Sequence, residues 1–401
     1  MRYPGPCVRQ SFAKGTFSPW FSLHLLTSMR RGELLMIRSA CAVLKVLSVI
    51  AFVCTTQAFA QYVFPSFPNP TINTGVHVIN GGGPALVPLA NGLYTNALEL
   101  IYVDTLQDVS LAYSTDGLHY TNVGYINPPP GGVAELDCTP AYADHCGVAA
   151  VAYNGELYVA YNDYSCNCLH VLQGTSDPGY ATFTWTDVYN DTAHQLTTTP
   201  TMLVTTDNPT HPNLIIRYGT TVSGNNAYSS VFNGSTNTWS TQASNGVSPT
   251  QSTLFAINGA NYAIDKSSGS STQVNITQLD DNGVAIPGTT YALQDDYATL
   301  GFSSVVYNND EWTVFVASRP QSSNELQLLS SSAYYDFADG VNWGSQTYPN
   351  NVLVPYDGSY PGDFAMTVYP PQPSGSAKIV VAYSGDSNGD LYATSGTVPV
   401  F

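Results

Sequence analysis

The sequence predicts an all-β protein, and three observations point to a six-bladed β-propeller. After residue 60, no stretch keeps the apolar spacing of an amphipathic helix. Short apolar and aromatic runs alternate there with Asn-Gly, Asp-Gly and proline-rich segments, a pattern typical of strands joined by turns. The runs fall into six similar units at intervals of roughly 47 to 67 residues, the spacing of propeller blades. Five or seven blades would also fit this spacing.

The unit at 147–188 gives the clearest pattern of one blade. It starts with a strand of small apolar residues from Gly147, turns at Asn154-Gly155 and continues with the strand LYVAY. A loop, a third strand and a short aromatic strand around Trp185 complete the unit. A lone four-stranded unit cannot bury both of its faces, so we expect the units to stack around an axis and form the core between them. An array of β-sandwiches is the alternative.

Other units repeat this order less regularly. They occupy residues 83–123, 213–241, 252–286, 304–343 and 364–396. We expect the ring to close through a strand near Val76-His77-Val78 that pairs with the last unit.

Charge excludes several classes of partner. Residues 1–60 contain seven of the 11 Lys and Arg residues and one of the 28 acidic residues, so the remainder has a net charge of −23. A polyanion offers no cationic surface to phosphate backbones or anionic lipid, so we expect no nucleic-acid partner and no membrane anchor. Only 10% of the residues are charged, against roughly 25% in ordinary globular proteins. This composition is typical of an extracellular all-β protein, and we expect a monomer.

The segment from Met36 to Ala60 has the three parts of a secretory signal peptide. These parts are a basic start with Arg38 and Lys45, an apolar stretch at 46–54, and the small-x-small pattern Ala58-Phe59-Ala60. The apolar stretch is too short to span a bilayer core of about 30 Å. We therefore predict a signal peptide region at 1–60, with the translation start at Met29 or Met36, and a single β-propeller domain at 61–401. The predicted location is secreted or extracellular, with the periplasm as an alternative.

Cysteine usage agrees with export. After residue 60 the chain contains Cys138, Cys146, Cys166 and Cys168. An even number in an oxidising compartment suggests two disulfides. Because one residue separates Cys166 from Cys168, we expect each of them to pair with one of the two upstream cysteines, which would staple the connection 126–147 to the second unit. The alternative is a metal site that includes His145 and His170, although the spacing matches no common structural zinc pattern.

One turn resembles a known motif. Residues Ser114 to Thr121 read Ser-Thr-Asp-Gly-Leu-His-Tyr-Thr, which is similar to the Asp-box of sialidase-like (neuraminidase-repeat) β-propellers. Degenerate copies occur at 336–343 and at Thr175-Ser176-Asp177 with Trp185. The resemblance covers residues 80–401 and implies a turn between third and fourth strands, away from the active face. It implies structural roles for Asp116, Asp177 and Asp339.

Sialidase chemistry, as the resemblance implies it, needs three arginines around the substrate carboxylate, a tyrosine nucleophile with a glutamate partner, and an acidic aspartate. Three guanidinium groups hold a sugar carboxylate through paired hydrogen bonds. After residue 60 the chain contains only Arg217 and Arg319. The arginine triad therefore cannot be built, and we expect no sialidase activity of this kind.

Charged residues recur at one point of the repeat. In a propeller, the connections between second and third strands and those between blades lie at the same end. The residues at or after the ends of the second strands are Asp104, Asp163, Asp265, Arg319 and Asp386, with Arg217 in the third unit. The connections between units add Glu135, Asp137, Asp295, Asp296 and Asp363.

From these positions we predict a ligand-binding set at one face. It consists of Asp104, Asp163, Tyr161, Asp265, Arg319 and Asp386, with Tyr164, Tyr218 and Tyr383 nearby. Carboxylates accept hydrogen bonds from hydroxyl groups and aromatic rings stack on sugars, so the predicted ligand is a carbohydrate.

Two other functions remain open. Paired carboxylates on the same face, with Asp137, Asp296 and Asp363 as candidates, could hydrolyse a glycosidic bond. An extracellular propeller that binds another protein is the third hypothesis. We expect no cofactor, with calcium as the ion that converging carboxylates would suit.

Overall fold

The structure is a computed structural model. The chain divides into two compact units, Met1–Gln61 and Tyr62–Phe401, and all residues described below belong to the second. The structure describes residues 72–79, 82–89, 97–128, 131–136, 138, 146–176, 182–206, 210–220, 226–247, 249–257, 259–267, 274–293, 299–309, 311–320, 325–332, 352–355, 364–369, 378–384 and 389–397.

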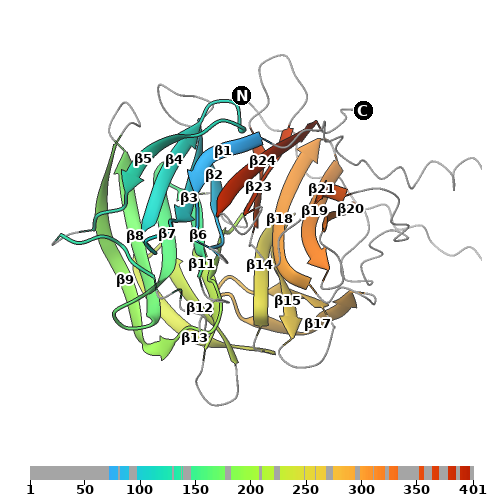
Figure 1. Ribbon diagram of the computed structural model, residues 1–401. Helices are drawn as coiled ribbons and strands as arrows, with labels where there is room; N and C mark the ends of the chain where they lie inside the picture. The colour runs from blue at the N-terminus through green and yellow to red at the C-terminus, as the bar shows by residue number, and fades with distance from the viewer. Residues whose placement is uncertain are drawn as a thin grey trace, which may run out of the picture. The chain divides into compact units, whose positions relative to one another are not determined.

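The described strands form six four-stranded antiparallel sheets, which we number as blades 1 to 6 (Figure 1). Blade 1 contains β2 (Ala85–Leu89), β3 (Ala97–Val103), β4 (Val109–Ser114) and β5 (Thr121–Tyr125). Blade 2 contains β6 (Val148–Tyr153), β7 (Glu156–Asp163), β8 (Cys168–Ser176) and β9 (Phe183–Gln195). Blade 3 contains β10 (Thr201–Val204), β11 (Leu214–Gly219), β12 (Asn226–Asn233) and β13 (Thr238–Val247).

The remaining blades follow the same order. Blade 4 contains β14 (Pro249–Ile257), β15 (Ala260–Ser267), β16 (Val274–Leu279) and β17 (Ala285–Leu293). Blade 5 contains β18 (Thr299–Asn309), β19 (Glu311–Pro320), β20 (Glu325–Ser332) and β21 (Val352–Pro355). Blade 6 contains β22 (Phe364–Tyr369), β23 (Lys378–Ser384), β24 (Asp390–Thr397) and the N-terminal strand β1 (Ile72–His77).

The six sheets close into a ring. The first strands of successive blades contact one another in order, from β2 through β6, β10, β14 and β18 to β22, and β22 contacts β2 again. Strand β1 completes blade 6 by pairing with β24, with Ile72 opposite Ala393, and the Thr74 hydroxyl donates a hydrogen bond to the Leu391 carbonyl (2.8 Å). The six-bladed propeller and its closure by an N-terminal strand are therefore confirmed, and the β-sandwich alternative is wrong.

Apolar side chains fill the space between neighbouring blades. Strand β3 is buried along its whole length because its alternate side chains face different neighbours. Leu98 and Leu100 pack with Val380 of blade 6, whereas Ile101 packs with Leu157 of blade 2. Because blade 1 is covered by a neighbouring blade on each of its faces, β3 is apolar on both faces except at Glu99.

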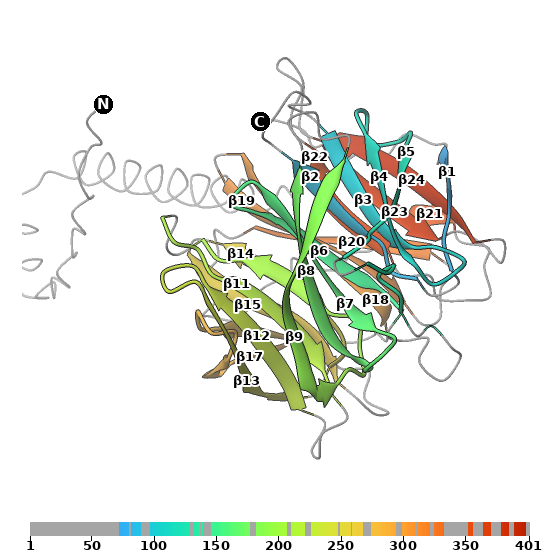
Figure 2. The ribbon, with the colours of Figure 1, turned by 90° about the vertical axis from the view of Figure 1, so that its left-hand side faces the viewer.

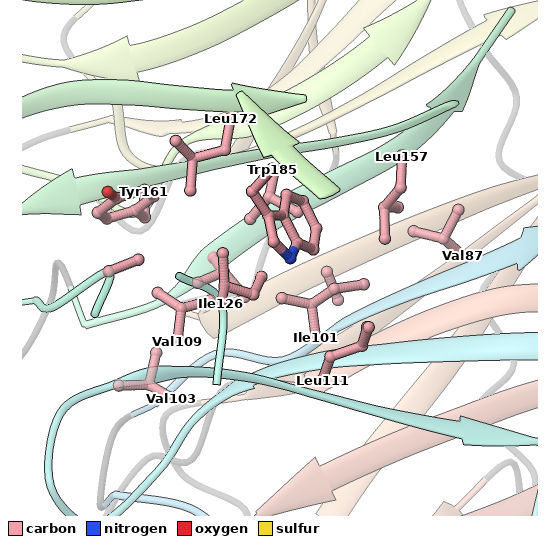
Figure 3. Close-up of a cluster of buried hydrophobic side chains, with 14 of the residues drawn as sticks. Val87, Ile101, Val103, Val109, Leu111, Ile126, Leu157, Tyr161, Leu172 and Trp185 are labelled. Carbon is pink, nitrogen blue, oxygen red and sulfur yellow. The ribbon is translucent and has the colours of Figure 1, made fainter. Parts of the chain in front are cut away.

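The interface between blades 1 and 2 centres on an indole ring (Figure 3). Trp185 of β9 is buried in a cluster with Val87, Ile101 and Leu172. On the neighbouring strand, a Cβ at Gly174 would lie 2.6 Å from the Trp185 ring, so a side chain there would displace the indole. Trp185 therefore packs at the interface between blades 1 and 2.

The turn between β4 and β5 has a fixed set of hydrogen bonds. Asp116 Oδ1 accepts bonds from the backbone N–H groups of Leu118 and His119 (both 2.8 Å), and Ser114 Oγ accepts one from the Gly117 N–H (2.8 Å). Gly117 has φ of +81°, and a Cβ there would meet Val380 Cγ2 at 2.8 Å. Asp116 thus has the structural role that was predicted, while Asp177 and Asp339 lie outside the described residues.

Partial burial favours the neutral form of Asp116, but the hydrogen bonds of this turn outweigh it and lower the pKa of the carboxyl to about 2. Asp116 is therefore ionised at neutral pH and committed to the turn. Within the ranges given above, the structure contains no helix with the length and apolar character needed to cross a membrane.

Candidate functional site

We call the end of the ring where the second strands end the upper face. The turns that follow β3 and β7 lie there, as do the connections from one blade to the next. The turn around Asp116 lies at the opposite end, since β4 and β5 run away from the upper face and back. Among the candidates that the structure describes, Asp104, Asp163 and Asp265 lie at or near the ends of β3, β7 and β15, which is this end.

A histidine between two carboxylates dominates the upper end of blade 2. His170 Nδ1 lies 3.1 Å from Asp163 Oδ2, and His170 Nε2 lies 2.8 Å from Asp187 Oδ2. Tyr161 stands opposite His170 across β7 and β8, and their rings stack with centroids 5.4 Å apart. Asp187 comes from β9, the long outer strand of blade 2 (Figure 2). Three neighbouring strands thus fix this cluster.

The electrostatics of the cluster follow from these contacts. Burial alone would lower the pKa of His170, but its bonds to Asp163 and Asp187 outweigh burial and raise that pKa. Burial would raise the pKa of Asp163, but bonds from His170 and Ser165 outweigh it and lower that pKa. The arrangement favours an imidazolium paired with the ionised Asp163 carboxylate.

Tyr161 does not offer a free ring to a ligand. Its side chain is fully buried, and burial, followed by the charges of Asp163 and Asp187, raises the pKa of its hydroxyl. We predicted a ligand-binding residue here, but the structure gives Tyr161 a packing role under His170. The next tyrosine along the chain differs, because Tyr164 is 56% exposed.

The turn that carries Tyr164 is tightly bonded. Asp163 Oδ1 accepts hydrogen bonds from both the backbone and the hydroxyl of Ser165. The Tyr164 N–H donates to the Glu135 carbonyl (2.9 Å), and Leu136 forms a β-bridge with Asp163. The connection from blade 1 is therefore attached to blade 2 beside the exposed ring.

The disulfide pairing predicted from the sequence is wrong. Cys138 bonds to Cys146, and Cys166 bonds to Cys168. The chain reverses at Asn167, whose φ of +52° is in the left-handed region, so the Cα atoms of Cys166 and Cys168 come within 5.1 Å, inside the usual bridging range. Both bridges are local, and the connection is held to blade 2 by backbone bonds instead.

The disulfides also bear on metal binding. All four cysteines are oxidised, so they do not supply the thiolates of the alternative metal site. Within the described ranges, no group of three or more His, Cys, Asp or Glu side chains is arranged to hold a metal ion.

A buried ion pair joins blades 3 and 4. Arg217 Nη2 donates to Asp265 Oδ2 (2.7 Å), and Arg217 Nε donates to Asp265 Oδ1 (3.2 Å). The Ser252 hydroxyl donates to the same Oδ1 (2.7 Å). The Arg217 side chain is 1% exposed and that of Asp265 is 8% exposed. Asp265 was predicted to bind ligand, but Arg217 and Ser252 enclose its carboxylate.

A second polar network, which sequence reasoning missed, lies between blades 2 and 3. Asp191 Oδ2 accepts a hydrogen bond from the Tyr218 hydroxyl (2.6 Å) and lies 2.7 Å from His194 Nδ1. Tyr218 is fully buried, and burial, followed by its bond to Asp191, raises the pKa of its hydroxyl. No sequence pattern marks the Asp191–Tyr218 contact because it joins strands of different blades.

The other predicted residues fall into two groups. Asp104 follows β3 and closes its turn, with Oδ1 accepting from the Leu106 and Asp108 N–H groups (2.8 and 3.1 Å). Arg319 lies in β19. Outside the described residues lie Asp137, Asp295, Asp296, Asp363 and Asp386. The carboxylates proposed for catalysis therefore stay predictions.

No protein-family model matches the sequence, and no curated protein matches it. Among solved structures, AofleA from Arthrobotrys oligospora is 10% identical, with a TM-score of 0.54 over 84% of this chain and 89% of that one. A Dyadobacter fermentans protein of unknown function is 11% identical, with a TM-score of 0.54 over 85% and 100% of the two chains.

The α-L-arabinanase of Penicillium chrysogenum, complexed with arabinobiose, is 11% identical, with a TM-score of 0.50 over 83% and 99% of the two chains. The chain has a β-propeller fold. At these identities the likeness extends to the fold alone. The β-propeller fold that the resemblance implied is confirmed.

Proposed function

We propose that the protein is secreted and binds carbohydrate at the upper end of blade 2. One observation carries this proposal: the exposed Tyr164 directly follows Asp163, whose carboxylate His170 holds in place together with that of Asp187. Carbohydrate sites combine an aromatic face for the sugar C–H surface with a few fixed polar groups for its hydroxyls.

The groups around Tyr164 suit this role. The Asp187 side chain is 42% exposed, with one oxygen beside His170, so a ligand can approach it from solvent. His170 and Ser165 fix Asp163. Because these groups are positioned before binding, a sugar would meet ordered acceptors rather than free side chains.

The charge of the site favours a sugar without a carboxylate. The Asp163 carboxylate, whose pKa is lowered, would repel an anionic ligand, and Arg217 is already bound to Asp265 inside the blade 3–blade 4 interface. A propeller of similar fold, the Penicillium arabinanase, holds a disaccharide, which makes a neutral oligosaccharide compatible with this fold. Secretion is supported by the predicted signal peptide and by the two disulfides.

A glycan array with the intact protein tests the proposal. We expect binding to neutral oligosaccharides and none to sialylated ones. Tyr164→Ala should weaken the binding of the best array ligand about tenfold, a loss of about 1.4 kcal/mol. Tyr125→Ala is the matched control, since Tyr125 is also exposed but lies on blade 1.

If wild type and Tyr164→Ala bound the best array ligand equally well, the proposed site at Tyr164 would be wrong. Release of reducing sugar by the wild-type protein would instead support the glycoside hydrolase hypothesis. Substitution of Asp137, Asp296 and Asp363 to Asn, one at a time, would then identify its carboxylates.

A further inference from the structure

Exposed apolar side chains gather on one part of the upper face. Among the residues that the structure describes, four large apolar side chains are exposed: Leu106, Tyr125, Val133 and Tyr164. Tyr164 belongs to the site on blade 2. The other three lie on blade 1 and on the connection that follows it. Large exposed apolar side chains on neighbouring segments of one face are a feature of interaction sites.

Backbone hydrogen bonds hold these three residues on a rigid support. Leu106 lies in the turn between β3 and β4, and Tyr125 ends β5. The connection runs between them: the Ala134 N–H donates to the Ile126 carbonyl (3.0 Å), and the Val109 N–H donates to the Ala134 carbonyl (2.7 Å). Val133 is thereby fixed next to both strands of blade 1.

Three carboxylates border the same surface. Asp108 forms a β-bridge with Glu135, and the Asp104 N–H donates to the Asp108 carbonyl (2.9 Å). Burial, followed by the nearby charges of Asp104 and Glu135, raises the pKa of Asp108. In the described part of the chain, none of these three carboxylates forms an ion pair.

We propose that this surface, formed by Leu106, Tyr125, Val133, Asp104, Asp108 and Glu135, docks a cationic segment of another protein that carries apolar side chains. Lysine or arginine of the partner would relieve the repulsion among the carboxylates, and its apolar side chains would cover the exposed aliphatic groups. We name this set the blade 1 surface.

Two features favour a polypeptide over a sugar here. Leu106 is 66% exposed, and aliphatic side chains such as leucine and valine lack the flat aromatic face on which sugars stack. The residues after 60 have a net charge of −23, so the whole domain attracts a cationic partner and repels an anionic one.

Fluorescence anisotropy with a labelled peptide that alternates lysine with leucine, glycine and serine tests the proposal. A matched peptide replaces every leucine by serine and keeps the charge. We expect the leucine-containing peptide to bind at least tenfold more tightly. The double variant Leu106→Ser/Val133→Ser, which changes no charge, should remove most of that difference.

Charge is tested separately. Glu135→Gln should weaken binding of the leucine-containing peptide severalfold, with a smaller salt dependence. Asp281→Asn is the control, because it makes the same change of net charge in the turn between β16 and β17 at the opposite end of the ring. Thermal unfolding of each variant would exclude loss of fold.

Three results would overturn the proposal. The two peptides could bind equally, which would leave only long-range attraction between charges. Asp281→Asn could weaken binding as much as Glu135→Gln does. Chitosan oligosaccharides, which are cationic glycans, could bind in place of the peptide and lose binding in the same variants.

The outcome is independent of the carbohydrate proposal. Tyr164→Ala should leave peptide binding unchanged if the two sites are distinct. A protein that binds the peptide but no glycan would refute the first proposal and support the second.

Discussion

Two carboxylate–cation contacts in this protein show how differently one repeat position can be used. Asp265 and Asp163 both lie near the end of a second strand. Asp265 is enclosed between blades 3 and 4 with Arg217, whereas Asp163 stays half-buried at the upper end of blade 2 with His170. The first contact joins blades, and the second fixes acceptors beside an exposed tyrosine.

The difference teaches that an acidic residue at a predicted site is available to a ligand only if no neighbouring blade supplies a cation. In a chain with two arginines after residue 60, Arg217 removes one candidate carboxylate from the upper face. A buried ion pair adds modest net stability, but the loss of one partner leaves an uncompensated charge in a dry interface.

The largest expected effect is therefore the loss of Asp265. Asp265→Ala should lower the free energy of unfolding by about 3–5 kcal/mol, because Arg217 would remain buried without its partner. Urea denaturation measures this change. Asp187→Ala, at the exposed end of the blade 2 cluster, is the matched control and should cost less than about 1 kcal/mol. If Asp265→Ala and Asp187→Ala lowered the free energy of unfolding by similar amounts, the buried ion pair would not contribute more to stability than the exposed contact.

A third carboxylate sharpens the comparison because it is buried without a cation. Glu99 of β3 is 1% exposed, both of its oxygens lack a hydrogen-bond partner, and burial raises its pKa from 4.5 to about 8. Glu99→Gln should stabilise the protein at pH 7 by about 3 kcal/mol, because burial of the carboxyl is unfavourable above its unfolded pKa.

The sign of the pH dependence follows. A folded-state pKa above the unfolded value gives stability that is complete below pH 4.5 and declines as pH rises to about 8. The stability advantage of Glu99→Gln, measured by urea denaturation, should grow over this range. A constant difference between variant and wild type from pH 4.5 to 8 would contradict the assignment.

The smallest effect concerns His170. Its pKa is raised in the folded state, so its contribution to stability should be complete below its usual pKa of about 6.5 and be lost as pH rises through the folded value. The difference in unfolding free energy between wild type and His170→Gln should therefore shrink as pH rises, and urea denaturation at several pH values measures it. The Arg217–Asp265 pair should show no such change, because arginine stays charged throughout. If the difference in unfolding free energy between wild type and His170→Gln were the same at pH 6 and pH 9, His170 would not be an imidazolium in the folded protein.

The fold was largely predictable from the sequence. Alternating apolar runs and turns identified the strands, and the repeat identified the blades, because both patterns are local. The disulfides were not predictable: the reversal at Asn167 that joins Cys166 to Cys168 depends on a single left-handed residue. For the site, the sequence placed Asp163 at the correct end but did not reveal His170 and Asp187 as its partners. Those contacts depend on the register of β8 and β9 against β7, with a shift between Val171 and Leu172.

The sequence by itself determined the strand pattern, the number of repeats and the sign of the charge, since each depends on residue type and spacing along the chain. Only the tertiary structure decided which carboxylates remain open to solvent. Arg217 and Asp265 are 48 residues apart, and they meet because ring closure sets one blade against the next. Burial and pairing across that interface, rather than the identity of the residue, decide whether an aspartate holds the protein together or faces a ligand.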